Sequence, residues 1–288
     1  MMNVLLAGAS GYVGGIINRE LKDNFNIIKL NKRSMNDDNI LCDLSDFESA
    51  KKLRIYKPDI IIHAAGNKNI QECEDNPHIA HQANTLSLIN LIRVFNGEAK
   101  IIYISTDYVF SGGEGLYKER DQAHPLTEYG RSKLRAEYEC INAAQSSATV
   151  LRLSALLDIN ATFPKFIISS LEEGREIECY SNVFYSPTYY VDFCLILRKL
   201  IECNDLKSKV YHSCGHRISR YDFAKNLCDT LGYDNNLIIE RENTMENKYL
   251  FHDLSLSNQY TEKELGVKKS NIEKILRNIE SSRKNESN

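Results

Sequence analysis

Short apolar runs alternate with amphipathic segments along the first half of the chain, and this alternation constrains the fold more than any other feature. Residues 3–7, 25–30, 59–66 and 148–153 form such runs. Each has the length of a strand and is rich in Ile, Leu, Val or Ala, which predicts strands buried on both faces. The segments between the runs carry apolar residues at helical spacing, as in residues 77–95. Strands that alternate with helices build a parallel sheet covered on both faces, so we predict a doubly wound α/β fold.

A glycine-rich turn, Gly8-Ala9-Ser10-Gly11-Tyr12-Val13-Gly14, joins the first predicted strand to the first predicted helix. Glycines let backbone amides approach a pyrophosphate, and the amino terminus of the following helix favours the same anion. The turn therefore predicts a Rossmann-type dinucleotide-binding fold, with a merely structural glycine turn as the alternative. The residues expected to bind the cofactor here are Gly8, Ser10, Gly11, Tyr12, Val13 and Gly14.

The end of the second predicted strand indicates which dinucleotide binds. An acidic residue there would select a ribose with a free 2'-hydroxyl. The residues present are Asn31, Lys32, Arg33 and Ser34, without an acid. Two cations and a hydroxyl at positions 32–34 favour a 2'-phosphate, so we expect NADPH, with NADH as the alternative. The same residues could instead form a solvated basic loop.

Four further residues belong to this expected cofactor site. Asp43 ends a short predicted strand and could accept a hydrogen bond from the adenine amino group or cap the next helix. The small residues Ala64, Ala65 and Gly66 would let a dinucleotide lie against the backbone. His63, just before them, is expected to be a packed core residue rather than a catalyst.

Polar residues, Ser105 to Tyr108, gather where the predicted strand 101–104 ends. Thr106 and Asp107 stand at its carboxyl end, where open α/β sheets bind their ligands. Tyr129 and Lys133 are four residues apart on a predicted helix and therefore share one face. A nearby ammonium favours the phenolate and lowers a tyrosine pKa that is otherwise near ~10. We expect Tyr129 to transfer a proton, Lys133 to be the cation beside it, and Thr106 to hold a substrate oxygen.

Charge and composition exclude several other classes. The net charge of -3 gives no reason to expect nucleic acid or an acidic membrane as partner. No apolar run approaches the ~18 residues of a membrane span, and the amino terminus leaves no room for a signal peptide. The eight cysteines form no Cys-x-x-Cys pair, which argues against a zinc cluster. We expect reduced thiols and a cytoplasmic protein.

The pattern changes after residue 153, where strands become brief and helices irregularly spaced. We expect residues 1–153 to form the dinucleotide-binding domain, with residues 188–215 returning to it. Residues 154–187 and 216–288 would form a smaller, interleaved α/β lobe that binds substrate. Residues 111–115 read as a glycine-rich loop that either closes over substrate or faces solvent.

Together these residues resemble the extended short-chain dehydrogenase/reductases over nearly the whole chain. The strings Ser105–Gly112 and Tyr129–Glu137 are similar to those of the dTDP-4-dehydrorhamnose reductase family. This resemblance implies NADPH-dependent reduction of the C4 keto group of a nucleotide-activated 4-keto-6-deoxy sugar, for surface polysaccharide biosynthesis. Tyr129 would protonate the alkoxide and Lys133 would hold the nicotinamide ribose. The resemblance also places Thr106 and Asp107 against the substrate, and Asp43 with Leu44 against the adenine.

The sequence departs from that family at three positions. Ala155 stands where a Trp is common, Gln71 where an Asp is frequent, and Gly15 where some members carry a magnesium-site Glu. These departures leave a related sugar open and argue against a metal. Two alternatives to the reductase are a non-catalytic NADP-binding regulatory subunit on the same fold, like that of methionine adenosyltransferase, and a nucleotide-sugar epimerase or dehydratase. A homodimer stays open.

Overall fold

The structure is a computed structural model that describes residues 1–33, 39–143, 147–244 and 249–286. The chain forms two compact units that alternate along the sequence. Unit 1 comprises Met1–Phe110, Gln122–Arg152 and Cys194–Tyr211. Unit 2 comprises Ser111–Asp121, Leu153–Phe193 and His212–Asn288.

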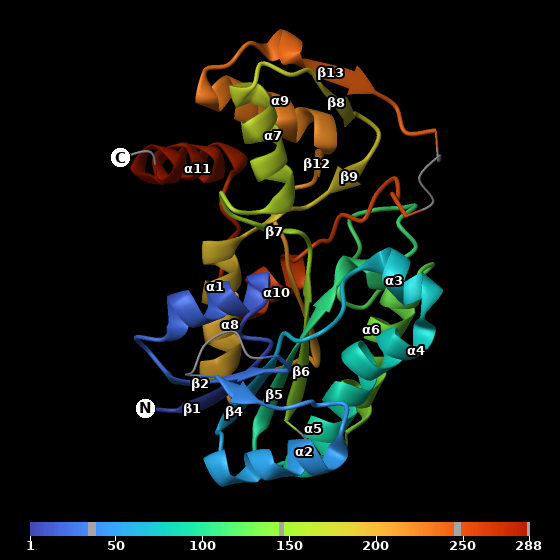
Figure 1. Cartoon of the computed structure of the whole chain (residues 1–288), viewed down its shortest axis with the longest axis vertical. Helices are drawn as coiled ribbons and strands as arrows, with labels where there is room; N and C mark the ends of the chain where they lie inside the picture. Colours follow the sequence, from blue (N-terminus) through green and yellow to red (C-terminus); the bar gives the residue numbers. More distant parts are fainter. Residues whose placement is uncertain (34–38, 144–146, 245–248, 287–288) are drawn as a thin grey trace. The chain divides into compact units, whose positions relative to one another are not determined.

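A seven-stranded sheet carries unit 1 (Figure 1), with strand order β11-β6-β5-β4-β1-β2-β3. The pairs β1–β2, β1–β4, β2–β3 and β4–β5 are parallel. The order reverses beside β1, which confirms the predicted Rossmann-type doubly wound sheet. Its strands are β1 (Asn3–Ala7), β2 (Asn26–Asn31), β3 (Ile40–Leu41), β4 (Ile60–His63), β5 (Lys100–Thr106), β6 (Ala148–Leu153) and β11 (Val210–Ser213).

Helices cover both faces of this sheet. Residues of α2, α5 and α6 share one apolar core with the strands, and in Figure 1 α1 and α8 lie on the opposite side. Every Ile, Leu or Val side chain buried here contributes roughly 1.5–3 kcal/mol of transfer free energy. These helices are α1 (Tyr12–Leu21), α2 (Phe47–Lys51) with a 3-10 turn over Lys52–Tyr56, α3 (Ile70–Asp75), α4 (Pro77–His81), α5 (Ser87–Phe95), α6 (Glu128–Asn142) and α8 (Tyr190–Glu202).

The predicted helix over residues 77–95 is interrupted in its middle. A π-helical turn, Gln82–Leu86, joins α4 to α5. The short helix α3, which comes before α4, was not among the predicted elements. The turn holds Asn84, whose amide nitrogen donates to the Asn67 carbonyl and to the Ser132 hydroxyl, both at 3.0 Å. A π turn often marks a functional position, and here it ties the loop after β4 to α6.

Unit 2 is built from helices and short strand pairs. Within its described residues, β7–β10 and β8–β13 pair parallel, and β9–β12 pair antiparallel. No helix in the described ranges of the whole chain is long and apolar enough to cross a membrane. The elements of unit 2 are β7 (Leu156–Leu157), α7 (Thr162–Glu172), β8 (Ile177–Tyr180), β9 (Phe184–Tyr185), β10 (Thr188–Tyr189), β12 (Ile218–Ser219), α9 (Arg220–Leu231), β13 (Ile238–Arg241), α10 (Gln259–Leu265) and α11 (Ile272–Glu286).

Candidate active site

The side chains of Thr106 and Tyr129 meet at the carboxyl end of β5. Thr106 is the last residue of that strand and is buried. α6 begins just before Tyr129, because the Thr127 side chain caps the helix by accepting a hydrogen bond from the Gly130 amide at 3.0 Å. The Thr106 hydroxyl lies close enough to Tyr129 for a side-chain hydrogen bond that lowers the pKa of the phenol. The structure therefore brings two of the predicted catalytic residues into direct contact.

The Thr106 hydroxyl has one proton, which Asp107 accepts in the structure and which a Tyr129 phenolate could also accept. It donates to Asp107 Oδ1 at 3.0 Å, while its oxygen accepts from the Tyr108 amide at 3.3 Å. A hydroxyl rotates to suit its surroundings. If Tyr129 loses its proton, the Thr106 hydroxyl can turn from Asp107 to the phenolate oxygen. The pair can thus accommodate both protonation states of Tyr129.

Burial determines the acidity of Tyr129. Desolvation raises its pKa above the ordinary 10.0, the hydrogen bond with Thr106 lowers it, and the Asp107 carboxylate raises it again. The net direction is upward, so the predicted net lowering of the Tyr129 pKa is wrong for this structure. The low-polarity surroundings outweigh any stabilisation of the phenolate. Tyr129 therefore keeps its proton at neutral pH.

The Lys133 amine is enclosed between α6 and β5. Its Nζ donates to the Ile104 carbonyl at 2.7 Å and lies 4.2 Å from the centroid of the Tyr103 ring, which favours a cation. Only 6% of Lys133 is exposed. Burial lowers the pKa of Lys133 to about 7, while the Glu137 carboxylate acts in the opposite direction. The charge on Lys133 is therefore sensitive to its immediate neighbours near neutral pH.

His63 is part of the core below this site. It is fully buried, its Nε2 lies 3.0 Å from Ser87 Oγ, and the Ser87 proton goes to the Ala83 carbonyl at 2.7 Å. Nε2 must therefore carry the proton of a neutral imidazole. Burial and the Lys133 charge lower the pKa of His63 to about 3. These contacts make His63 a neutral packing residue.

The glycine turn lies against the loop that follows β4, at the point where the strand order reverses. A Cβ on Gly8 would come 2.7 Å from the Ala65 backbone, and Gly8 has φ +84°. A Cβ on Gly14 would come 2.1 Å from the Gly8 carbonyl oxygen. Only glycine fits at Gly8 and Gly14 without backbone movement. α1 therefore starts close to β1, with Tyr12 and Val13 as its first residues.

Asn31, at the end of β2, leaves a polar atom without a partner. Its Oδ1 accepts from the Ser10 amide at 2.9 Å, which fixes the orientation of the side-chain amide. Its Nδ2 is buried and has no hydrogen-bond partner among the described residues. An unsatisfied buried donor costs roughly 1–3 kcal/mol. An orphaned donor beside a glycine turn fits a fold that receives a polar ligand such as a dinucleotide.

The predicted adenosine-side residues are arranged differently from the expectation. Lys32 Nζ forms an ion pair with Asp43 Oδ2 at 2.8 Å. The two side chains that were expected to contact the cofactor are therefore bound to each other. Asp43 does not cap α2, because Asp46 does so by accepting from the Ser49 amide. Arg33 is exposed, and Ser34 lies outside the described residues. The Leu44 side chain is buried in the core of unit 1.

The residues after β4 form an open edge. Ala64 and Ala65 are half-buried, and Gly66 is exposed. A Cβ on Gly66 would come 2.5 Å from Asn84 Oδ1, which also accepts from the Asn67 amide at 2.7 Å. This loop therefore has small residues where a ligand can approach and an asparagine that holds its backbone.

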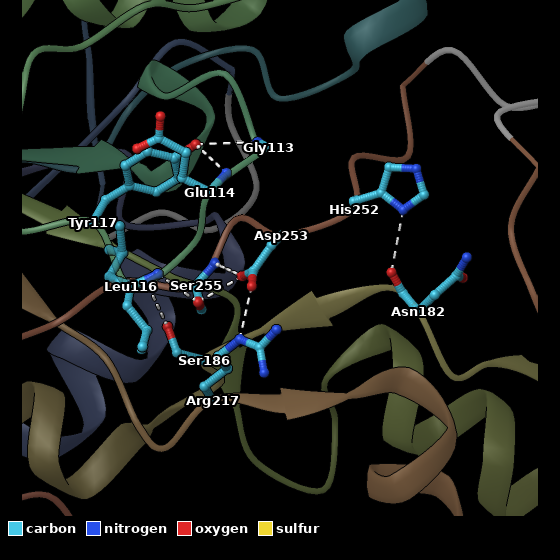
Figure 2. A network of polar contacts seen from close by, with 11 residues as sticks. Gly113, Glu114, Leu116, Tyr117, Asn182, Ser186, Arg217, His252, Asp253 and Ser255 are labelled. Atoms are coloured by element: carbon cyan, nitrogen blue, oxygen red, sulfur yellow. Dashed lines mark hydrogen bonds and ion pairs between the residues drawn. The ribbon is translucent and has the colours of Figure 1, made fainter.

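The loop Ser111–Gly115 is folded onto unit 2 (Figure 2). The Tyr117 hydroxyl accepts hydrogen bonds from the amides of Gly113 and Glu114, each at 3.1 Å. A Cβ on Gly115 would come 2.1 Å from the Asp253 carboxylate. These contacts anchor the loop, while Gly113 and Glu114 themselves are exposed to solvent.

The Asp253 carboxylate connects this loop to the rest of unit 2. It accepts from Arg217 Nε at 2.7 Å and from the Ser255 hydroxyl at 2.6 Å. The Ser255 hydroxyl oxygen in turn accepts from the Leu116 amide at 2.8 Å. The Arg217 guanidinium also lies 3.5 Å from the centroid of the Phe184 ring. A buried carboxylate thus fixes the position of the loop.

The three departures from the family pattern lie at exposed positions. Ala155 is exposed, Gln71 donates to Asp75 at 2.7 Å, and a Cβ on Gly15 would meet nothing within 4 Å. Among the described residues, no group of three or more His, Cys, Asp or Glu side chains is placed to hold a metal ion.

The fold and these sites define the class of protein. The chain has the features of an extended short-chain dehydrogenase/reductase. These are a doubly wound parallel sheet, a glycine turn where its strand order reverses, and a Tyr and a Lys four residues apart on the helix after β5. More closely, the chain belongs to the RmlD substrate binding domain family, which matches residues 2–269.

Known relatives of the chain include both a reductase and a subunit of another enzyme. It is 27% identical over 252 residues to the probable low-salt glycan biosynthesis reductase Agl14 of Haloferax volcanii, covering 82% of this chain and 83% of that protein. It is 26% identical to methionine adenosyltransferase 2 subunit beta of Danio rerio, covering 82% and 76%. The structure of dTDP-4-dehydrorhamnose reductase from Bacillus anthracis, in complex with NADP, superimposes with a TM-score of 0.84 at 24% identity, covering 98% and 99%.

Proposed function

We propose that the protein reduces the C4 keto group of a nucleotide-activated 4-keto-6-deoxy sugar with NADPH, for surface polysaccharide biosynthesis. The observation that carries the proposal is the contact between the Thr106 and Tyr129 hydroxyls at the end of β5, with Lys133 on the same helix face. The kinship with a glycan biosynthesis reductase supports the reaction class. The sugar itself rests on the resemblance of the strings at 105–112 and 129–137.

The raised pKa of Tyr129 suits reduction. NADPH supplies the hydride when it is bound. The oxygen that receives the electron pair becomes an alkoxide, which is far more basic than a phenolate, so a phenol that is protonated at neutral pH can donate to it. Thr106 holds the same oxygen, and its hydroxyl proton then turns to the Tyr129 phenolate.

Lys133 has two roles in this proposal. Its ammonium stabilises the phenolate after proton transfer, since an opposite charge favours the ionised form. When the cofactor is bound, the amine would also donate to the ribose next to the nicotinamide. Burial lowers the pKa of Lys133 to about 7. The protonated fraction of Lys133 would therefore rise when a negatively charged oxygen, such as the Tyr129 phenolate, comes close to the amine.

The cofactor site comprises the glycine turn, the end of β2 and the loop after β4. Gly8, Gly11 and Gly14 would admit the pyrophosphate at the start of α1. Arg33 is an exposed cation beside the end of β2, and that strand ends without an acid, which favours the 2'-phosphate of NADPH over NADH. The remaining cofactor contacts would come from Ser10, Tyr12, Val13, Lys32, Ser34, Asp43, Leu44, Ala64, Ala65 and Gly66.

Tyr129→Phe tests the proposal most simply. The variant keeps the ring and its edge contact with Tyr108, whose centroid lies 5.7 Å away, but cannot donate a proton. Loss of general acid catalysis lowers kcat by about 10²–10⁴-fold, whereas the Kd of NADPH should stay within about twofold because phosphate and adenosine contacts persist. Turnover is measured by NADPH oxidation with dTDP-, UDP-, GDP- and CDP-linked 4-keto sugars. A fully active variant would eliminate the proposed role of Tyr129.

A second candidate is a non-catalytic NADP-binding regulatory subunit. The relative named methionine adenosyltransferase 2 subunit beta favours it, as does Ala155 where the reductases commonly have Trp. Co-purification with a second enzyme, together with NADPH binding but no turnover across the sugar panel, would support this function instead.

A further inference from the structure

Glu137 is fully buried one helical turn beyond Lys133. Its carboxylate accepts from Arg152 Nε at 3.0 and 3.1 Å and from Arg152 Nη2 at 2.7 Å. It also accepts from the Ser105 hydroxyl at 2.5 Å. Arg152 is 4% exposed and its guanidinium lies 5.0 Å from the Phe110 ring centroid. All of these residues belong to unit 1.

This carboxylate connects three elements at the proton-transfer site. Ser105 lies on β5 between Ile104, whose carbonyl receives the Lys133 amine, and Thr106, whose hydroxyl contacts Tyr129. Arg152 lies on β6. Glu137 therefore ties α6 to the strand segment that carries the partners of both Lys133 and Tyr129.

We propose that Glu137 is a positioning residue that keeps the Lys133 amine charged and in place against β5. The catalytic role of Lys133 in this inference rests on the proposed function. The protonation of the Lys133 amine, however, can be measured without turnover. A buried ion pair near a catalytic lysine need not add stability. Its effect here is on the neighbouring amine.

The groups that face Lys133 come from four elements. On α6 they are Glu137 and the Cys140 thiol. β5 contributes the Tyr103 ring, and β4 contributes His63, which burial keeps neutral. Arg152 reaches from β6 and donates to the Glu137 carboxylate. Among these groups, Glu137 provides the negative charge that opposes the effect of burial on Lys133.

Removing the carboxylate should therefore make the Lys133 amine lose its proton more easily. Glu137→Gln deletes the negative charge and breaks its ion pair with Arg152, which disfavours a second cation nearby. A double variant, Glu137→Met with Arg152→Met, removes both charges and replaces the pair by apolar side chains, a change that folds tolerate. Its effect on Lys133 should have the same sign and be smaller.

The test is an NMR titration of the protein labelled with ¹³C at the lysine ε-carbons, with the Lys133 signal assigned by its loss in Lys133→Arg. We expect the Lys133 midpoint to fall by about one pH unit or more in Glu137→Gln, and by less in the double variant. An unchanged midpoint in the double variant would overturn the proposal, even if Glu137→Gln does not fold.

Asp253→Asn is the matched control. It breaks another carboxylate–arginine pair with a buried acid, that of Arg217 and Asp253 in unit 2, and should lower the melting temperature without moving the Lys133 midpoint. A shift of equal size in this control would also overturn the proposal, because it would show a general response to destabilisation. Absence of turnover in the wild type would count against the proposed function and would leave this titration intact.

Discussion

Two glycines, one at the start of the glycine turn and one in the helix that follows it, should respond in opposite ways to the same substitution. Gly8 has φ +84°, and a Cβ there would lie 2.7 Å from the Ala65 N and Cα atoms and 2.9 Å from the Ala64 carbonyl carbon. Gly15, seven residues later, has nothing within 4 Å of a Cβ and lies in α1. Gly8→Ala should therefore destabilise the fold, and Gly15→Ala should stabilise it.

The magnitudes follow from these geometries. An L-residue in the left-handed region costs about 1–2 kcal/mol, and a clash with backbone, which no rotamer can relieve, adds about 1–3 kcal/mol. Gly8→Ala should thus lower the free energy of unfolding by about 2–5 kcal/mol. Gly15→Ala should raise it by about 0.5–1 kcal/mol, because alanine is the better residue in a helix interior.

Urea unfolding and NADPH fluorescence titration measure the two consequences. Relief of the Gly8 clash must move the Ala64–Ala65 backbone, which forms the other wall of the proposed cofactor site, so the Kd of NADPH should rise at least about tenfold, or about 1.4 kcal/mol. Gly15→Ala should leave that Kd within about twofold. If Gly8→Ala bound NADPH as the wild type does, the assignment of the turn to the cofactor would be refuted.

Three further changes test other parts of the account. The pKa of His63 is lowered from 6.5 to about 3 by folding. At pH values between these two, the unfolded chain therefore carries a proton on His63 and the folded protein does not. Stability should fall by about 1.4 kcal/mol per pH unit below about 6.5, and His63→Gln should flatten this slope in urea unfolding at pH 4.5–7. Tyr117→Phe removes the acceptor of the Gly113 and Glu114 amides and should cost about 1–3 kcal/mol, with faster hydrogen exchange in residues 111–115; unchanged exchange would contradict the described loop. Asn31→Asp replaces an amide by a carboxylate that repels a 2'-phosphate, so the Kd for NADPH should rise more than the Kd for NADH; an equal change in both would contradict the adenosine-side assignment.

Local patterns in the sequence were sufficient for most of the fold. The strands and the glycine turn follow from apolar runs and from Gly8 and Gly14, where side chains would meet backbone. The contact between Thr106 and Tyr129 follows from a strand end and the next helix in an alternating α/β chain. Both inferences depend on residues that are close together in the sequence and on a general rule for α/β folds. The sequence alone therefore contains the information that they need.

Long-range contacts and burial could not be read in the same way. The Lys32–Asp43 ion pair depends on how the ends of two strands approach each other, so Lys32 was predicted as a free phosphate ligand. The direction of the Tyr129 pKa depends on how completely the site is buried, which the spacing to Lys133 does not contain. The Glu137–Arg152 pair could have been suspected only from the polar side chains within an apolar helix face and strand.

The most direct test of the account follows deuterium from cofactor to sugar. The wild-type protein is incubated with NADPH carrying two deuterons at nicotinamide C4 and with each 4-keto sugar of the nucleotide panel, and the product is examined by NMR. Our account predicts one substrate whose product carries a single deuteron on sugar C4, and no such product from Tyr129→Phe. NADPH that binds but transfers no deuteron to any sugar would contradict the reductase and leave the regulatory subunit as the better description.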